Sequence, residues 1–330
     1  MSDIADAFAT HNPARVPNLF IVGAPKAGTT ALHRYLEAHS QVFMTRPKEP
    51  NFFNTDHDVR QPARSVEEYM ALYEGWGAER YAGEGTVWYL HSTEAARHIK
   101  QISPDAKIVM VLRNPIVALY SHHYQILKHA NQDILDFEEA FEAGLTREGG
   151  TGLPAKYFVR ETLMYHRIYL YKEQVQRYLD CFDRSQLLIL IYDDLKADQD
   201  GTLAKLLDFL GLDAETGVEV ERVNPNRQAR SQWLNRLVKH QDSPIYQTAK
   251  KLVPLKGLRR AIRSSMHSIN DKVNLQEVAR PPLSAAMTAR LQDHFRADIE
   301  ALSVLLDRDL THWVTPTTDE IHADDDGVAA

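Results

Sequence analysis

The chain has 330 residues, 44% of them hydrophobic, which is enough to bury one large core or two smaller ones. Its net charge of −7 and its pI near 6.1 argue against general nucleic-acid binding. No apolar run of roughly 18 residues occurs, so the sequence predicts no transmembrane helix.

The first predicted strand, near residues 18–23, ends in a glycine-containing turn, and a helix is predicted over 29–39. This layout is typical of a phosphate-cradling loop, because the N–H groups at a helix N-terminus point at the anion. A Walker loop carries its lysine directly after the second glycine, whereas two threonines follow Gly28 here and the lysine is Lys26. The loop can therefore hold a phosphate but lacks the usual lysine for a nucleoside triphosphate. An ordinary strand–turn–helix connection is the alternative.

A proline-flanked carboxylate follows a short strand predicted near residues 41–44. Glu49 lies between Pro47 and Pro50 and is followed by two phenylalanines. Such a stiff, partly apolar setting can make a carboxylate a useful base. A turn with a solvated glutamate is the alternative.

The strand predicted at residues 107–112 is a continuous apolar run, as expected of a strand buried on both faces. Arg113 follows its carboxyl end, where open α/β sheets bind ligands, and Ser121 lies about two turns into the next helix. An arginine fork and a serine hydroxyl placed in this way could share one phosphate. The alternative is a surface ion pair and a solvent-facing serine.

The remaining chain alternates predicted strands and helices, which indicates an α/β fold. We expect a three-layer, P-loop-like architecture with a central, mostly parallel sheet flanked by helices. The tyrosines at helical spacing near residues 157–178 are interpreted as packing residues. The other predicted elements are helices at 66–76, 93–101, 137–144, 158–181, 202–210 and 284–306, and strands at 81–85 and 187–191.

Taken together, these segments resemble the sulfotransferase superfamily that uses 3′-phosphoadenosine 5′-phosphosulfate (PAPS). The order and spacing look most like the branch of the heparan sulfate N- and 3-O-sulfotransferases and its bacterial relatives. The resemblance runs from about Leu19 to Trp313. The matching segments are the Pro-Lys-Ala-Gly-Thr-Thr loop, Lys-Glu-Pro-Asn-Phe-Phe, residues 81–90, Leu-Arg-Asn-Pro with its following serine, and residues 305–313.

The resemblance implies a role for each matched residue, and it implies no metal. Glu49 would take the proton of the acceptor, and Lys48 would assist with charge near the sulfate. Arg113 and Ser121 would bind the 3′-phosphate of the cofactor. The 5′-phosphosulfate would be held by Lys26, which also acts in catalysis, and by Ala27, Gly28, Thr29 and Thr30. Arg227 and Arg230 are candidates to cover the nucleotide.

Two departures from the family pattern concern the acceptor and the cofactor loop. Relatives of the heparan sulfate enzymes often have an acceptor-contacting lysine after the glutamate of the 81–90 segment, and Gly85 occupies that place here. The single cysteine, Cys181, cannot form the internal disulfide that animal members often carry. The implied acceptor is a carbohydrate or glycolipid-type molecule, sulfated on oxygen or nitrogen, with other lipids and small metabolites as alternatives.

A basic segment over residues 222–263 holds eleven Lys or Arg residues against one acid. Four interpretations stay open: an anionic acceptor, the cofactor phosphates, peripheral membrane contact through 249–263, or a solvated helix face. We expect a single domain over 1–315 and an unstructured acidic tail over 316–330. One cysteine and the absence of a signal-peptide pattern predict a cytoplasmic protein.

Two rival functions remain. A P-loop kinase or other phosphotransferase would need an acid that holds Mg²⁺, and Asp193-Asp194 after a predicted strand is interpreted rather as a helix cap. The other rival is a nucleotide-binding scaffold without turnover. The complete set of Lys26, Glu49, Arg113 and Ser121 argues against that scaffold.

Overall fold

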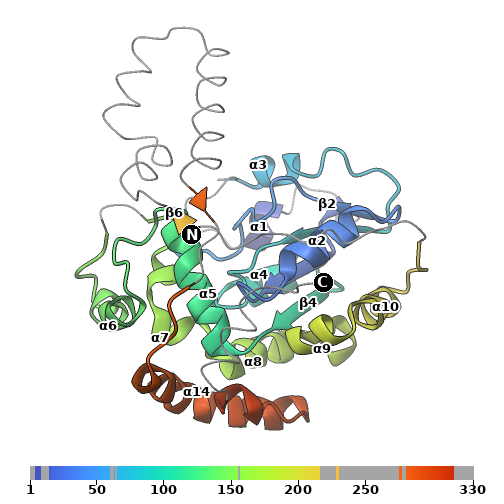
Figure 1. The fold of residues 1–330 in the computed structure, drawn as a ribbon. Coiled ribbons are helices and arrows are strands. Elements are labelled where there is room, and N and C mark those ends of the chain that lie inside the picture. The colour runs from blue at the N-terminus through green and yellow to red at the C-terminus, as the bar shows by residue number, and fades with distance from the viewer. Residues whose placement is uncertain are drawn as a thin grey trace, which may run out of the picture.

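The centre of the protein is a parallel β-sheet. The computed structural model describes residues 4–8, 15–59, 63, 65–154, 157–215, 228–229, 275–276 and 280–315. Within them, a five-stranded sheet has the order β2-β3-β1-β4-β5, and every neighbouring pair is parallel. The carboxyl ends of its strands therefore share one edge (Figure 1). The strands are β1 (Leu19–Gly23), β2 (Val42–Met44), β3 (Tyr81–Gly85), β4 (Lys107–Leu112) and β5 (Leu187–Ile191).

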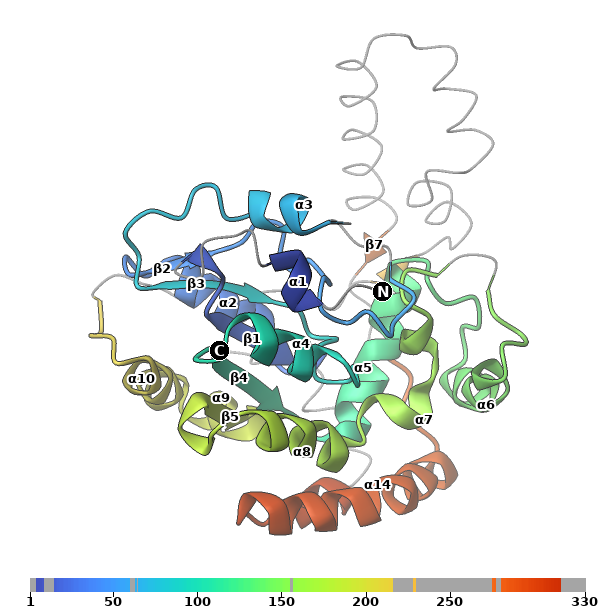
Figure 2. The ribbon, with the colours of Figure 1, turned by 180° about the vertical axis from the view of Figure 1, so that it is seen from behind.

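Helices cover both faces of the sheet, as Figures 1 and 2 show. The connection from β1 to β2 and the connection from β3 to β4 run toward opposite edges, and right-handed crossovers then put α2 and α4 on opposite faces. The helices are α1 (Ile4–Phe8), α2 (Thr29–Glu37), α3 (Val66–Ala71), α4 (Ala95–Ile102), α5 (Pro115–Lys128), α6 (Phe137–Glu148), α7 (Tyr165–Ile168), α8 (Tyr171–Cys181), α9 (Tyr192–Ala197), α10 (Gln199–Leu210) and α14 (Ala285–Leu306).

Shorter elements complete the described chain. Three 3-10 helices span Arg160–Leu163, Arg184–Gln186 and Thr311–Val314, and β6 (Gln228–Ala229) pairs antiparallel with β7 (Leu275–Gln276). Helix α14 packs on α8 and α5. None of the helices in the described ranges is both long enough and apolar enough to span a bilayer. The predicted α/β fold with helices on both faces of a mostly parallel sheet is confirmed.

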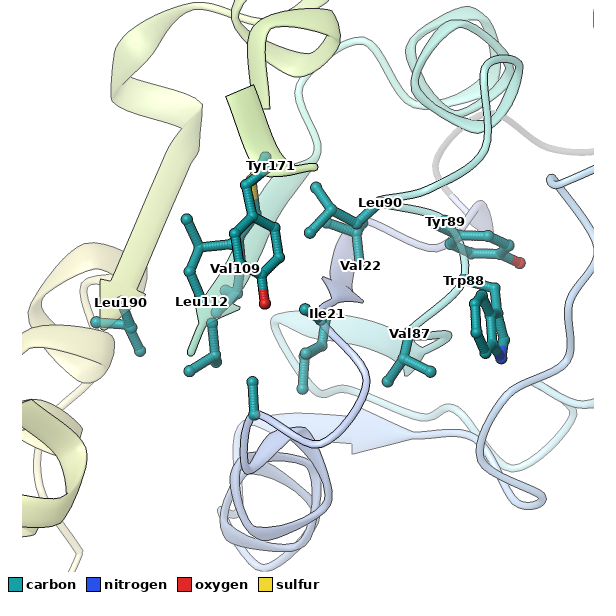
Figure 3. Packing of buried hydrophobic residues seen from close by; sticks show 14 of the residues in the cluster. Ile21, Val22, Val87, Trp88, Tyr89, Leu90, Val109, Leu112, Tyr171 and Leu190 are labelled. Atoms are coloured by element: carbon teal, nitrogen blue, oxygen red, sulfur yellow. The ribbon is translucent and has the colours of Figure 1, made fainter. Parts of the chain in front are cut away.

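One part of the core lies where the segment after β3 crosses the end of β1. Leu90 donates its N–H to the Val22 carbonyl at 2.8 Å, and both side chains are buried. Figure 3 shows these two side chains beside Val109 and Leu112 of β4 and the ring of Tyr171. Strands β1 and β4 are buried along nearly their whole length, which explains their uninterrupted apolar sequences.

The single long helix predicted over residues 158–181 is wrong. The structure has a 3-10 turn and two helices there, and the last of them, α8, begins at Tyr171. The reason is tertiary: the Asp298 carboxylate, from α14, accepts the N–H groups of Tyr171 and Lys172 at 2.7 and 3.1 Å. That cap starts a new helix at this point. The packing role of the tyrosines is confirmed for Tyr165, Tyr169, Tyr171 and Tyr178, which are fully buried.

The other predicted helices and strands are present, with boundaries shifted by a few residues. Helix α3 is shorter than the predicted 66–76 and ends at Ala71, and the Ser65 hydroxyl caps its start by accepting the Glu68 N–H. Gly211 terminates α10 in a left-handed conformation with φ 60°, as expected of a glycine stop. Nearly all of the basic segment 222–263, and the tail 316–330, lie outside the described residues.

Candidate functional site

The loop between β1 and α2 forms an open cradle of backbone N–H groups. Gly28 caps α2 at φ 85° without a side-chain hydrogen bond, and Lys26 has φ 62°. No described residue accepts a hydrogen bond from the N–H of Gly28, Thr29 or Thr30. The N–H of Ala27 differs, because it donates to the Ala24 carbonyl at 3.3 Å and closes the turn. Three of the four N–H groups predicted to hold an anion therefore have no acceptor within the described chain.

The Arg113 side chain binds the backbone of this cradle. Arg113 follows β4, is 4% exposed, and its Nη1 donates to the Lys26 carbonyl at 2.9 Å. Its guanidinium carbon lies 4.4 Å from the centre of the Tyr192 ring. Ser121 is buried on α5, and its hydroxyl has no hydrogen-bond partner within the described ranges. The structure thus joins the side chain of Arg113 to the backbone of the Lys26 loop.

Several positive charges converge on the Lys26 ammonium group. Burial, the largest cause, and the charges of Arg113, Arg280 and Lys128 together lower the pKa of Lys26 to about 7. The lysine side chain remains half-buried, so a ligand can still reach it. A cluster of cations that pushes one of its members toward the neutral form is a strong attractor for a polyanion.

Arg280 is the site residue that sequence reasoning missed. Its guanidinium carbon lies 4.9 Å from the Tyr124 ring centre on α5, and its charge acts on Lys26. The adjacent Pro281 carbonyl accepts a hydrogen bond from the Tyr120 hydroxyl, which ties the segment to α5. The sequence feature that could have pointed to Arg280 is its position directly before two prolines and a capped helix. The predicted counterparts, Arg227 and Arg230, lie outside the described residues.

The second half of the site follows β2. Glu49 has φ 67° and a side chain one-third exposed, and its Oε1 lies 3.0 Å from the Lys48 ammonium. Gly85, at the end of the neighbouring strand β3, leaves room for that lysine: a Cβ there would lie 3.3 Å from Lys48 Cε and 3.1 Å from His33 Cδ2. Gly85 therefore lies against the stem of Lys48.

The interpretation of Asp193-Asp194 as a helix cap is wrong. Helix α9 begins without a side-chain cap, and both carboxylates bind the C-terminal segment instead. Asp194 accepts two hydrogen bonds from Arg308 at 2.6 and 2.8 Å, and Asp193 accepts one from the Trp313 indole at 2.7 Å. Both carboxylates therefore have hydrogen-bond partners within the C-terminal segment of the chain.

A family profile described as "Sulfotransferase domain" matches residues 16–298. The chain belongs to the sulfotransferase family. Mouse heparan sulfate glucosamine 3-O-sulfotransferase 6 is 31% identical over 198 residues, covering 60% of this chain and 53% of that protein. Mouse bifunctional heparan sulfate N-deacetylase/N-sulfotransferase 4 is 26% identical over 204 residues, covering 60% of this chain and 22% of that protein.

A solved sulfotransferase from Alicyclobacillus acidocaldarius has the same fold. Its TM-score is 0.63 at 24% identity, over 90% of this chain and 98% of that chain. The match to the mouse 3-O-sulfotransferase spans about half of the relative's length. The family resemblance predicted from the motifs is confirmed.

Proposed function

We propose that this sulfotransferase moves a sulfuryl group from PAPS to a hydroxyl or amine of an acceptor. The observation that carries the proposal is the open N–H cradle beside the cluster of Lys26, Arg113 and Arg280. Such a site suits a ligand with two separate phosphate groups. We retain with it the predictions of a cytoplasmic location and of one domain over residues 1–315.

The cofactor would be held by both backbone and side chains. The free N–H groups of residues 28–30 would bind the 5′-phosphosulfate, and the two threonine hydroxyls would add hydrogen bonds. Arg113 and the buried Ser121 hydroxyl would bind the 3′-phosphate, which ATP lacks. We add Arg280 as a further cation for the cofactor phosphates, on the evidence of its effect on Lys26.

The transfer itself is expected to be in line and loose, by analogy with phosphoryl transfer, so positioning and charge stabilisation dominate. The acceptor oxygen or nitrogen forms a bond to sulfur while the bond from sulfur to the bridging phosphate oxygen breaks. Lys26 would stabilise charge on the departing phosphate. Glu49 would take the acceptor proton, and Lys48, 3.0 Å from it, would balance the charge near the sulfate.

For the acceptor we propose a carbohydrate or glycolipid-type molecule. The support is the group of relatives whose names describe action on heparan sulfate. Gly85 argues for a contact pattern different from that of the family members with a lysine there, because Lys48 lies across this position. A panel of sulfate acceptors comprising oligosaccharides, glycolipids and small alcohols would separate these classes by PAPS-dependent product formation.

The cofactor site is tested by thermal unfolding with 3′,5′-adenosine bisphosphate, 5′-ADP and Mg·ATP in parallel. A ligand that binds only the folded state stabilises it, by about 2.7 kcal/mol at a concentration 100 times the Kd. We expect strong stabilisation by the bisphosphate alone, and its loss in Arg113→Ala. Arg15→Ala is the control, because Arg15 binds the Trp76 and Gly77 carbonyls before β1, at the opposite end of the sheet.

Stabilisation by Mg·ATP without any by the bisphosphate would overturn the proposal in favour of a kinase-like enzyme. Strong binding of the bisphosphate with no sulfuryl transfer to any acceptor class would instead favour the scaffold.

A further inference from the structure

A fully buried carboxyl group, that of Glu84, lies at the end of β3 beneath the loop that carries Glu49. Its Oε1 accepts hydrogen bonds from the hydroxyls of Tyr69 and Tyr89 at 2.7 and 3.0 Å, and its Oε2 accepts one from Thr86 at 2.6 Å. No described cation lies within ion-pair distance of it. A buried acid with three hydroxyl donors and no countercharge needs an explanation.

Two of these hydroxyls, those of Tyr89 and Thr86, also bind the backbone of residues 51–53. The Tyr89 hydroxyl accepts the N–H groups of Phe52 and Phe53 at 3.0 and 3.3 Å, and the Thr86 hydroxyl accepts the N–H of Asn51 at 3.3 Å. An ionised carboxylate can only accept hydrogen bonds, so each hydroxyl must turn its hydrogen toward it. The lone pairs of both hydroxyls then face the loop. Figure 3 shows Tyr89 with its hydroxyl directed away from the strands.

Backbone preference alone does not favour the shape of residues 49–53. Glu49 and Asn51 have φ 67° and 53°, in the left-handed region that costs a non-glycine residue roughly 1 kcal/mol or more. The Asn51 side chain donates to the Glu49 carbonyl at 2.8 Å, which links the two residues directly. Phe52 stacks on Tyr69 with ring centres 4.4 Å apart. Tyr69, which donates a hydrogen bond to Glu84, therefore also packs on the loop.

We propose that Glu84 is a positioning residue: through the Thr86 and Tyr89 hydroxyls it fixes residues 51–53 and so aims the Glu49 carboxylate at the acceptor. This inference deepens the proposed function and rests on it for the role of Glu49. It assigns no contact between Glu84 and any substrate. It explains why an acid, rather than an apolar residue of similar volume, occupies this buried place.

The electrostatics of the pair support the assignment. Burial, the largest cause, and the charge of Glu49 raise the pKa of Glu84 to about 7 against the opposing effect of its three hydrogen bonds. The carboxyl group is therefore close enough to Glu49 for their charges to interact. When Glu84 is protonated, its carboxyl group also donates a hydrogen bond. One of the three hydroxyls must then accept that hydrogen bond instead of donating one. The network should be tested at about pH 8, where the Glu84 carboxyl group is mostly ionised.

The decisive experiment is a double-mutant cycle with Glu84→Gln and Glu49→Gln, measured as kcat for sulfuryl transfer. Misplacing a reacting group by about 1 Å can cost on the order of 100-fold, so we expect Glu84→Gln to lower kcat by about 10- to 100-fold. Bisphosphate affinity should stay unchanged. In the Glu49→Gln background the same change should cost less than about 2-fold, because residues acting as a unit are not additive.

The matched control is Asp298→Asn, which alters a half-buried carboxyl group that also binds backbone N–H groups. We expect it to lower the melting temperature and to leave kcat unchanged. If Glu84→Gln does not fold, Thr86→Val and Tyr89→Phe carry the same test, since each removes one bridging hydroxyl. Full kcat in these variants, or multiplicative losses in the cycle, would overturn the proposal.

A second measurement separates this inference from the proposed function. Amide hydrogen exchange at Asn51, Phe52 and Phe53 reports directly on the held segment and needs no substrate. Glu84→Gln should speed exchange at these three amides by at least about 10-fold, with no such change in β4. Unchanged exchange refutes the positioning role even if the enzyme is a sulfotransferase. Faster exchange in a protein without transfer activity would refute only the proposed function.

Discussion

Replacing Glu49 by glutamine should lower sulfuryl transfer by about 10²–10⁴-fold, the usual cost of removing a general base. The amide keeps the size of the side chain but cannot take the acceptor proton. The cofactor cradle lies after a different strand, β1, so bisphosphate binding should be unaffected. Initial rates with saturating PAPS, together with a thermal shift by the bisphosphate, measure the two effects separately.

Glu94→Gln provides the comparison for this variant. Glu94 lies at the start of α4 and pairs with Arg97 on the surface, so its loss should leave transfer unchanged. Wild-type turnover in Glu49→Gln would disprove the assignment of the base and would leave the buried Glu84 network without its proposed purpose.

Lys26→Met should reduce turnover by about 10²–10³-fold, the range seen when one preorganised donor to developing charge is removed. Methionine preserves the length of the side chain and removes only its ammonium group. Unlike Glu49→Gln, this variant should also weaken bisphosphate binding, since Lys26 would contact the phosphate of the departing nucleotide. Titration calorimetry with the bisphosphate and steady-state rates give both numbers.

The pH dependence of binding identifies the same lysine. With a pKa of about 7 in the free protein, Lys26 is protonated below that pH and neutral above it. A bound phosphate raises the pKa of the lysine, so binding takes up a proton, and affinity should fall as the pH rises above about 7. Calorimetry in buffers of different ionisation enthalpy measures this uptake. It should vanish in Lys26→Met, and Lys100→Met, altered on the distant helix α4, should keep it. A pH-independent affinity in the wild type would contradict the role.

Local sequence signals were sufficient for much of the cofactor half of the site. The apolar runs of β1 and β4 are buried on both faces, and this burial is what makes them readable as strands. The turn chemistry around Gly28 and the position of Arg113 directly after a strand are likewise short-range patterns. Lys26 and Arg113 could be assigned to one edge because parallel strands end there together, and the structure places Arg113 against the Lys26 carbonyl.

Contacts between residues far apart in the chain determined the features that the sequence did not predict. The break that starts α8 at Tyr171 depends on Asp298, which is 127 residues away in the chain. Arg280 joins the site only because its segment is tied to α5 through Tyr120. No pattern within a short window records such contacts, so a continuous helix over residues 158–181 was the natural local prediction.

The sequence by itself determined the parallel α/β fold, which follows from periodicity, and the family, whose motifs each span only a few residues. Only the tertiary structure decided how the candidate site residues are supported. The sheet order puts β3 between β2 and β1, and this places the carboxyl group of Glu84 beneath the Glu49 loop and Gly85 against Lys48. Burial and neighbouring charge, which set the pKa of both Lys26 and Glu84, arise only when strands distant in sequence pack together.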